Sequence, residues 1–414
     1  MKNDKLLLQI NTDLNLIARE SLTQRVLEII VQAPAITSET TGRVALNLAL
    51  VLDRSGSMSG RKLDYVKQAA IHLLDMLQEQ DRVALVTFDN TVDVISPSRL
   101  VTKQNRRDLQ DQISRIESGG STFLSGGWLA GGEEVARHQD AGMLNRILLL
   151  TDGQANVGVT DMEILAQQAG ELSHRGISTS TFGVGLDFNE YLLEGMANQS
   201  EGNYYFIDAP EKAHEFFLQE IGQIQKIILH EVEVILDLSQ SIGLNVLGGW
   251  KNWRTENHLH ISIGSLYSLQ IQKIYAMLMA PKDDKSADIV LKALVLGKDK
   301  AGQVYEFNAQ VVYNYTDEVG VKGGQLDLGV MGRFAVVYLA ETANSALKIE
   351  RVGRNEVASQ FLNQAIQEFG IYLDPTERER YLQMAERMKR GMLEPDRKIS
   401  QYASYNIRRS KETR

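Results

Sequence analysis

The hydrophobic pattern of the chain centres on an unbroken apolar run, Leu48–Leu52, which ends abruptly in a polar loop. A run of this length without polar alternation is typical of a strand buried on both faces of a parallel sheet. The loop that follows carries Asp53, Ser55 and Ser57 at alternate positions. Because open α/β sheets bind ligands at the carboxyl ends of their strands, we expect these three side chains to form part of a site.

Strand-like and helix-like patterns alternate from Val44 to about residue 229. Apolar residues recur at helical spacing within Arg61–Gln78, and a second buried strand is predicted at Arg82–Phe88. The alternation continues through segments predicted at 105–116, 124–137, 145–150, 162–174, 177–183, 189–197, 204–207 and 211–229. Strands and helices alternating in this way predict an α/β fold with a doubly wound, mainly parallel sheet.

The pattern changes after His230, where strand-like segments follow one another without helices between them. These segments are predicted at 231–236, 258–263, 270–278, 287–296 and 304–315. They indicate an antiparallel sheet or β-sandwich. Residues 5–33 also form strand-like patterns, so we expect them to join this sandwich and the α/β domain to be inserted into it.

Helical patterns dominate the C-terminal region. Apolar stripes over Ala343–Phe369 and Thr376–Met392 predict a helical hairpin, and the basic residues that follow, from Arg408 to the end, predict a flexible tail. The predicted organisation is sandwich strands at 1–36, an α/β domain at 42–229, the remaining sandwich at 230–341, a helical hairpin at 343–394 and a flexible basic tail at 395–414.

Composition narrows the class of protein. The net charge of −9 over 414 residues argues against non-specific binding of nucleic acid. The chain has no cysteine, which excludes a disulfide framework and a thiolate nucleophile. No window approaches the roughly 20 apolar residues of a membrane span, and the first residues lack a signal-peptide pattern. We therefore expect a cytoplasmic protein with no membrane partner.

Two later stretches carry oxygen donors that complete a site with the first loop. Ser121 and Thr122 follow a glycine pair, and Asp152 follows the apolar run at 147–150. Hydroxyl and carboxylate oxygens suit a small, hard divalent cation such as Mg²⁺. A plain structural alternative is that the serines and aspartates only cap turns and helices.

The motifs Asp-x-Ser-x-Ser, Gly-Gly-Ser-Thr and Thr-Asp-Gly occur in this order and resemble the metal-ion-dependent adhesion site of the von Willebrand factor A domain. The resemblance covers about residues 42–229, roughly half of the chain. It implies a metal site made by five residues, with Thr122 favoured over Ser121: Asp53, Ser55, Ser57, Thr122 and Asp152. It also implies that the ion keeps an open position for an aspartate or glutamate of a partner protein.

A domain of this type set into a β-sandwich is similar to the inter-α-trypsin inhibitor heavy chains and their bacterial relatives. The resemblance therefore implies Mg²⁺-dependent protein binding, although the sequence does not distinguish Mg²⁺ from Mn²⁺ or Ca²⁺. Specificity is expected to come from the loops around Arg61, Asn90, Phe123, Asn156 and Asp187.

The sequence bears on three other functions. The chain could be an adaptor for a separate AAA+ ATPase of the MoxR or chelatase type, since it has no Gly-x-x-x-x-Gly-Lys-[Ser/Thr] motif of its own. It could be a scaffold in which the ion only stabilises the loops. An enzyme is disfavoured, because a haloacid-dehalogenase phosphatase needs an acid where Ser55 stands, and Ser55 lacks the glycine pattern of a nucleophile elbow. We expect no catalytic residue.

Overall fold

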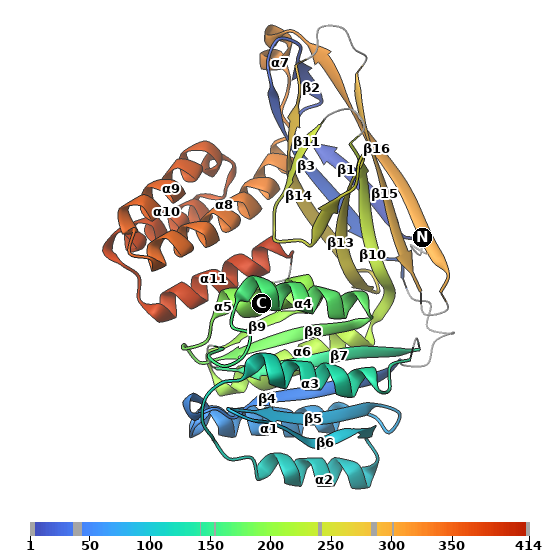
Figure 1. Cartoon of the computed structure of the whole chain (residues 1–414). Coiled ribbons are helices and arrows are strands. Elements are labelled where there is room, and N and C mark those ends of the chain that lie inside the picture. Colours follow the sequence, from blue (N-terminus) through green and yellow to red (C-terminus); the bar gives the residue numbers. More distant parts are fainter. Residues whose placement is uncertain are drawn as a thin grey trace. The chain divides into compact units, whose positions relative to one another are not determined.

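The computed structural model describes residues 5–35, 44–140, 142–152, 155–238, 242–282, 288–299 and 302–410 (Figure 1). The chain divides into two compact units. Unit 1 combines Met1–Ile36 with Ile228–Arg414, and unit 2 is Thr37–Ile227, so unit 2 is inserted between two segments of unit 1 along the chain. The sequence-predicted boundary at residue 42 lies outside the described residues.

Unit 2 contains a six-stranded sheet in the order β6-β5-β4-β7-β8-β9. Every neighbouring pair is parallel except β5 and β6, which form an antiparallel edge. The strands are β4 (Ala45–Asp53), β5 (Arg82–Phe88), β6 (Val92–Leu100), β7 (Met143–Thr151), β8 (Ile177–Val184) and β9 (Tyr204–Ile207). The predicted mainly parallel sheet is therefore confirmed, with the apolar run of β4 between two other strands.

Helices cover both faces of this sheet (Figure 1). Their bounds are α1 (Arg61–Met76), α2 (Lys103–Ser114), α3 (Leu124–Ala136), α4 (Met162–His174), α5 (Glu190–Gln199) and α6 (Pro210–Gln225). The apolar stripes of α1, α2 and α6 share one core with the sheet. On α3, a Cβ added to Gly131 would lie 2.4 Å from Val51 Cγ2. Glycine therefore lets α3 lie close against β4, the strand that leads into the predicted site.

Unit 1 contains a β-sandwich of two sheets, ordered β1-β3-β14-β11 and β12-β13-β10-β15-β16-β2. The strands are β1 (Leu7–Thr12), β2 (Leu16–Ala18), β3 (Thr23–Gln32), β10 (Ile227–Asp237), β11 (Gly243–Val246), β12 (Asn252–Arg254), β13 (His258–Tyr267), β14 (Ile271–Ala280), β15 (Ile289–Lys298) and β16 (Val304–Thr316). The pairs β1/β3, β3/β14, β14/β11, β12/β13, β10/β15 and β15/β16 are antiparallel, whereas β2 pairs with β16 in parallel. The N-terminal strands join the sandwich as expected, because β3 pairs with β14 along its full length.

The C-terminal part of unit 1 is more helical than the sequence predicted. Its helices are α7 (Glu318–Gly323), α8 (Leu328–Arg351), α9 (Asn355–Phe369), α10 (Pro375–Arg390) and α11 (Glu394–Arg408). Helix α8 begins inside the predicted sandwich segment, where Asp327 caps it by accepting from the Val330 backbone N–H. The single helix predicted at 343–369 is divided near Gly353, whose φ of 80° no helix interior adopts.

The prediction of a flexible tail at 395–414 is wrong for the described residues up to 408, which form α11. Tyr405 and Arg408 are buried, and the Arg408 guanidinium lies 3.4 Å from the Glu341 carboxylate of α8. The Arg409 guanidinium lies 3.6 Å from the centre of the Trp250 ring. The basic composition suggested a solvated segment, but these cations have partners within unit 1.

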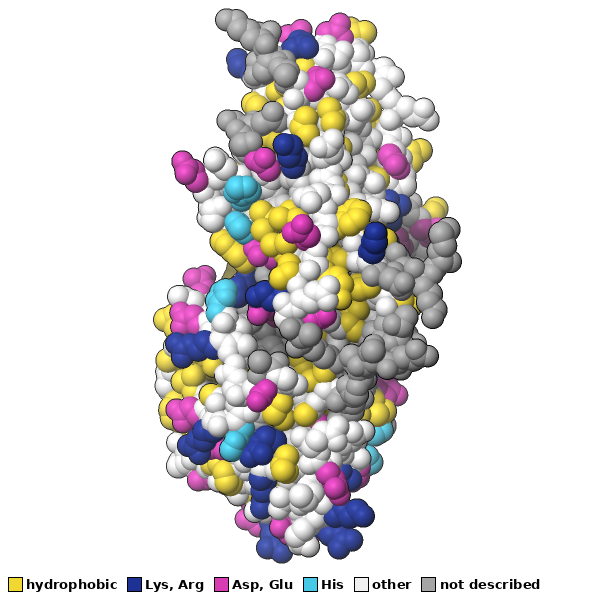
Figure 2. Space-filling model, turned by 90° about the vertical axis from the view of Figure 1, so that its right-hand side faces the viewer, with side chains coloured by type: hydrophobic (Ala, Val, Ile, Leu, Met, Phe, Trp, Pro, Cys, Tyr) yellow, Lys and Arg dark blue, Asp and Glu magenta, His cyan; other side chains and the backbone are white. Residues whose placement is uncertain are grey.

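The described helices include none that is both long and apolar enough to cross a lipid bilayer. On the face of the molecule shown in Figure 2, acidic and basic side chains are interspersed rather than gathered into one continuous patch of a single sign.

Candidate metal centre

Three loops meet at the carboxyl edge of the unit 2 sheet. The first follows β4, and the second follows β7, its parallel neighbour, with Leu52 paired to Leu150 one residue before each strand ends. The third precedes α3 and carries the glycine pair and Thr122. Since parallel neighbours end at the same edge, Asp53 and Asp152 are brought to the same part of the sheet.

Direct hydrogen bonds link the first two loops. The Ser57 hydroxyl donates to Asp152 Oδ1 at 2.7 Å, and the hydroxyl oxygens of Ser55 and Ser57 lie 3.2 Å apart. Asp53 Oδ1 accepts from the Ser55 backbone N–H at 2.8 Å, and Asp53 Oδ2 accepts from the Thr151 hydroxyl. Four of the five predicted residues therefore belong to one network.

The third loop is held to the first by backbone hydrogen bonds. The Gly119 N–H donates to the Arg54 carbonyl at 2.6 Å, and the Gly56 N–H donates to the Gly120 carbonyl at 2.8 Å. Thr122 is buried, whereas its neighbour Ser121 is exposed. The resemblance favoured Thr122 over Ser121 as the residue of the site, and this assignment stays a prediction.

A glycine is needed where the third loop passes Asp89. A Cβ added to Gly119 would lie 1.8 Å from Asp89 Oδ2, and one added to Gly120 would lie 2.8 Å from Asn90 Oδ1. The glycine pair is thus explained by the close approach of the loop that positions Thr122, and no larger side chain fits there without movement.

Asp53 and Asp152 are both fully buried. Burial raises the pKa of Asp53 to about 6, and the neighbouring charge of Asp152 also raises it, whereas hydrogen bonds from Thr151 and Ser55 oppose this shift. A nearby positive charge would therefore stabilise the ionised form of this buried carboxylate. A cation at this edge of the sheet would supply that charge.

Lys62 belongs to the site, although the sequence analysis did not identify it. Its Nζ lies 2.5 Å from Asp152 Oδ2 and 2.8 Å from Asp187 Oδ2. The sequence does place Lys62 in the first turn of the helix now seen as α1. A cation is disfavoured there by the helix dipole unless acids lie nearby, and this could have marked Lys62 as part of a site. Asp187 itself was expected only as part of a specificity loop.

The donor set fits a hard divalent cation. Among the described residues, no group of three or more His, Cys, Asp or Glu side chains is arranged to hold a metal. The oxygen donors of the network are instead mostly hydroxyls supported by two carboxylates. Such neutral oxygen ligands suit Mg²⁺, which binds few carboxylates and retains water.

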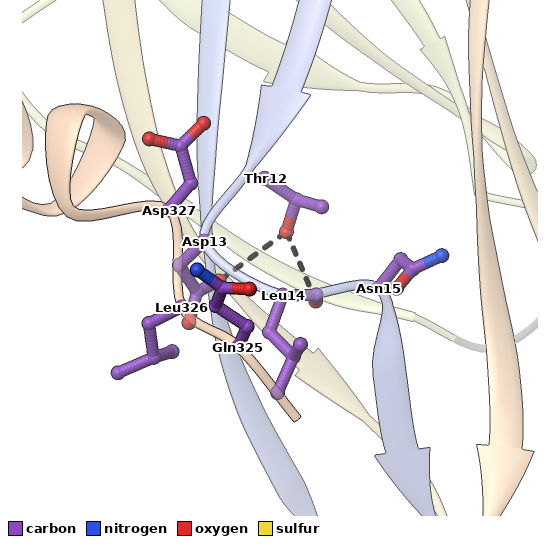
Figure 3. Close-up of a pocket in the computed structure, with 7 residues that line it drawn as sticks. All are labelled: Thr12, Asp13, Leu14, Asn15, Gln325, Leu326 and Asp327. Atoms are coloured by element: carbon purple, nitrogen blue, oxygen red, sulfur yellow. Dashed lines mark hydrogen bonds between the residues drawn. The ribbon is translucent and has the colours of Figure 1, made fainter. Parts of the chain in front are cut away.

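An open pocket lies in unit 1, at the turn between β1 and β2 (Figure 3). Its volume is about 370 Å³, and it is lined by Thr12, Asp13, Leu14, Asn15, Gln325, Leu326 and Asp327. Asp13 accepts from the Val26 backbone N–H at 2.8 Å, and Asp327 caps α8. Both carboxylates therefore accept hydrogen bonds from the local backbone, which ties the pocket lining to β3 and to the start of α8.

Comparison with known proteins relates part of the chain to one type of domain. Residues 47–220 match the model of the von Willebrand factor type A domain. The uncharacterized protein sll0103 of Synechocystis sp. is 31% identical over 57% of this chain and 54% of its own length. Inter alpha-trypsin inhibitor, heavy chain 4, of Mus musculus is 31% identical over 40% of this chain and 18% of its own. The match thus spans about half of the first relative and less of the second.

The whole chain also resembles a solved structure in fold. The ArnB paralog VWA2 from Sulfolobus acidocaldarius superposes with a TM-score of 0.66 over 98% of each chain, at 16% sequence identity. The family model covers the three loops at the sheet edge, and the two relatives match the chain in sequence. The chain therefore contains a von Willebrand factor type A domain over residues 47–220.

Proposed function

We propose that this chain is a divalent-metal-dependent interaction module that binds an acidic residue of a partner protein. The observation that carries the proposal is the network in which Ser55, Ser57 and Asp152, from two loops, converge at the carboxyl edge of the parallel sheet. Von Willebrand factor type A domains form a family of metal-dependent interaction modules. The proposed ion is Mg²⁺.

Each residue of the network has a distinct part in this proposal. Ser55 and Ser57 would hold the ion with Thr122, while Asp53 fixes the first loop through the Ser55 N–H and Asp152 orients the Ser57 hydroxyl. When bound, the ion supplies a positive charge for a partner carboxylate. Because the three proposed direct ligands are neutral hydroxyls, that charge is only partly cancelled by the protein.

Ser57 is exposed, which allows a partner to reach the proposed ion, whereas Ser55 and Asp53 are buried. Nothing in the proposal requires a bond of the partner to be broken, so we propose recognition rather than catalysis. The partner itself is defined only by its chemistry, an aspartate or glutamate on an accessible surface.

The test is affinity capture from a native lysate by the immobilised full chain, in Mg²⁺ and in EDTA. We expect captured proteins to be retained in Mg²⁺ and lost in EDTA, and lost also with Asp53→Ala and Ser57→Ala. Ser59→Ala, which removes an exposed hydroxyl two residues away, is the matched control and should retain them. Circular dichroism of each variant checks folding. Equal capture by all variants in both buffers would contradict the proposal, and an AAA+ ATPase among the captured proteins would identify the adaptor role.

A further inference from the structure

Lys62 places a positive charge directly against the proposed metal centre. Its ammonium group lies between two carboxylates, 2.5 Å from Asp152 Oδ2 and 2.8 Å from Asp187 Oδ2. Asp152 is fully buried, whereas the Asp187 side chain is 69% exposed. The lysine therefore joins a buried acid of the proposed centre to an acid on the surface loop after β8.

The elements around Lys62 fix the position of its side chain. The residue lies in the first turn of α1, where the positive end of the helix dipole repels a cation. On its other side, a Cβ added to Gly185 would lie 3.0 Å from Lys62 Cε, and Gly185 has a φ of 76°. The loop after β8 thus passes close to the lysine stem, and the carboxylates of Asp152 and Asp187 offset the repulsion from the helix end.

The ammonium and a divalent ion would draw on the same negative charge. Asp152 Oδ1 accepts from Ser57, and Asp152 Oδ2 contacts Lys62, so one carboxylate serves both the proposed ion ligand and the lysine. Two cations a few ångströms apart in a partly buried setting repel each other strongly. The lysine must therefore affect how tightly the centre holds its ion.

We propose that Lys62 weakens the affinity of the centre for its divalent ion by competing for the charge of Asp152, and that Asp187 moderates this competition by holding the same ammonium group. This inference rests on the proposed function, since it assumes that the centre binds an ion. Lys62 lies outside the five-residue motif. In this proposal it sets the ion concentration at which the module can bind its partner.

The first test is calorimetric titration of the full chain with MgCl₂. Lys62→Met keeps the length of the side chain and removes its charge, and we expect its dissociation constant for Mg²⁺ to be at least about tenfold lower than that of the wild type, equivalent to about 1.4 kcal/mol. Lys62→Arg keeps the charge and should bind at least about tenfold more weakly than Lys62→Met. An unchanged or weaker affinity in Lys62→Met would overturn the inference.

A double-mutant cycle tests the part assigned to Asp187. In the wild-type background, Asp187→Asn should weaken Mg²⁺ binding, because the ammonium then pairs with Asp152 alone. In the Lys62→Met background the same substitution should have little effect, since the exposed Asp187 charge is screened by solvent. Equal weakening in both backgrounds would show that Asp187 acts on the ion directly and would contradict its proposed part.

The same titrations separate failure of this inference from failure of the proposed function. If neither the wild type nor Lys62→Met binds Mg²⁺ more tightly than Ser57→Ala does, there is no ion centre and both proposals fail. If the wild type binds and Ser57→Ala does not, while Lys62→Met matches the wild type, only the inference fails. Unfolding temperatures in EDTA, read by circular dichroism, establish that each variant is folded.

Discussion

The Ser57 hydroxyl lies where two loops meet, because it donates to the buried Asp152 carboxylate and lies 3.2 Å from the Ser55 hydroxyl. The motif residues of the first two loops could be proposed from the sequence because they follow directly after apolar strands. Thr122 could be proposed only from the glycine pair before it and from the resemblance to the known motif. Lys62 could not be predicted in the same way, since its partners are 90 and 125 residues away along the chain. Only the folded sheet brings those acids to the first turn of α1.

Replacing Ser57 by alanine tests the role of a single residue, the proposed ion ligand Ser57. The variant loses one proposed ligand and the hydrogen bond to Asp152, so we expect Mg²⁺ affinity to fall at least about tenfold, or about 1.4 kcal/mol. Stability without metal should change by no more than about 1 kcal/mol, as for loss of a single hydrogen bond. Ser59→Ala is the control in the same loop. Isothermal calorimetry and urea unfolding measure the two quantities, and equal affinities of the two variants would contradict the role of Ser57.

At the scale of elements, the strands and helices of the α/β domain could be predicted from the spacing of apolar residues. Strands β4 and β7 are buried on both faces and give unbroken apolar runs, whereas α1 is buried on one face and gives an apolar stripe. The pattern was less informative in the C-terminal region. A continuous apolar stripe across 343–369 does not reveal that Gly353 adopts a positive φ and divides α8 from α9. Likewise, the basic composition at the end of α11 gave no sign that Arg408 pairs with Glu341 or that the following Arg409 lies over Trp250, since both partners are far away along the chain.

The loop before α3 provides a prediction at this scale. Gly119→Ala forces a methyl group against Asp89 Oδ2, so the loop that carries Thr122 must move. We expect a loss of about 1–3 kcal/mol in stability, as for other overpacked sites, together with weaker Mg²⁺ binding. Gly222→Ala in α6 is the matched control, because its added Cβ meets no atom within 4 Å. This control should leave Mg²⁺ affinity unchanged and should not lower stability, since alanine favours helix. Similar Mg²⁺ affinities of the two variants would contradict the account of this loop.

At the scale of the whole molecule, unit 1 is assembled from both ends of the chain. Glu28 of β3 is fully buried and joins these ends, because its carboxylate accepts from Arg333 of α8 at 2.6 and 2.7 Å and from Tyr275 of β14 at 2.9 Å. The alternating strands allowed the sandwich to be predicted. The buried ion pair could not be, since Glu28 and Arg333 are 305 residues apart.

This pair makes the stability of unit 1 depend on pH. Burial alone would raise the pKa of Glu28, but hydrogen bonds from Arg333, Asn11 and Tyr275 outweigh it and lower the pKa below its usual value of 4.5. The carboxylate therefore stabilises the folded state fully above pH 4.5, and this stabilisation is lost as the pH falls through the lower folded-state pKa. Wild-type unit 1 should lose urea resistance in that acidic range, and Glu28→Gln should lose less.

Arg333→Met tests the same pair at neutral pH. It leaves Glu28 buried without its cation, so we expect a loss of about 2 kcal/mol, as for hydrogen bonds to charged groups. Lys322→Met on α7 is the control, because its ammonium is 79% exposed and lies 3.9 Å from Glu318. Urea unfolding at pH 7, followed by tryptophan fluorescence, should show a lower midpoint only for Arg333→Met. Equal midpoints for both variants would show that the Glu28 pair does not hold the ends of unit 1 together.

The central claim, that three loops of the von Willebrand factor type A domain share one ion, is tested most directly by crystals of the full chain soaked in MnCl₂. Anomalous diffraction above the manganese absorption edge locates the ion without assumptions about its ligands. The account predicts one strong peak in this domain, within coordination distance of the Ser55 and Ser57 hydroxyls and beside Thr122, Asp53 and Asp152. A fully soaked crystal without a peak there, or with its strongest peak elsewhere in the domain, would contradict it.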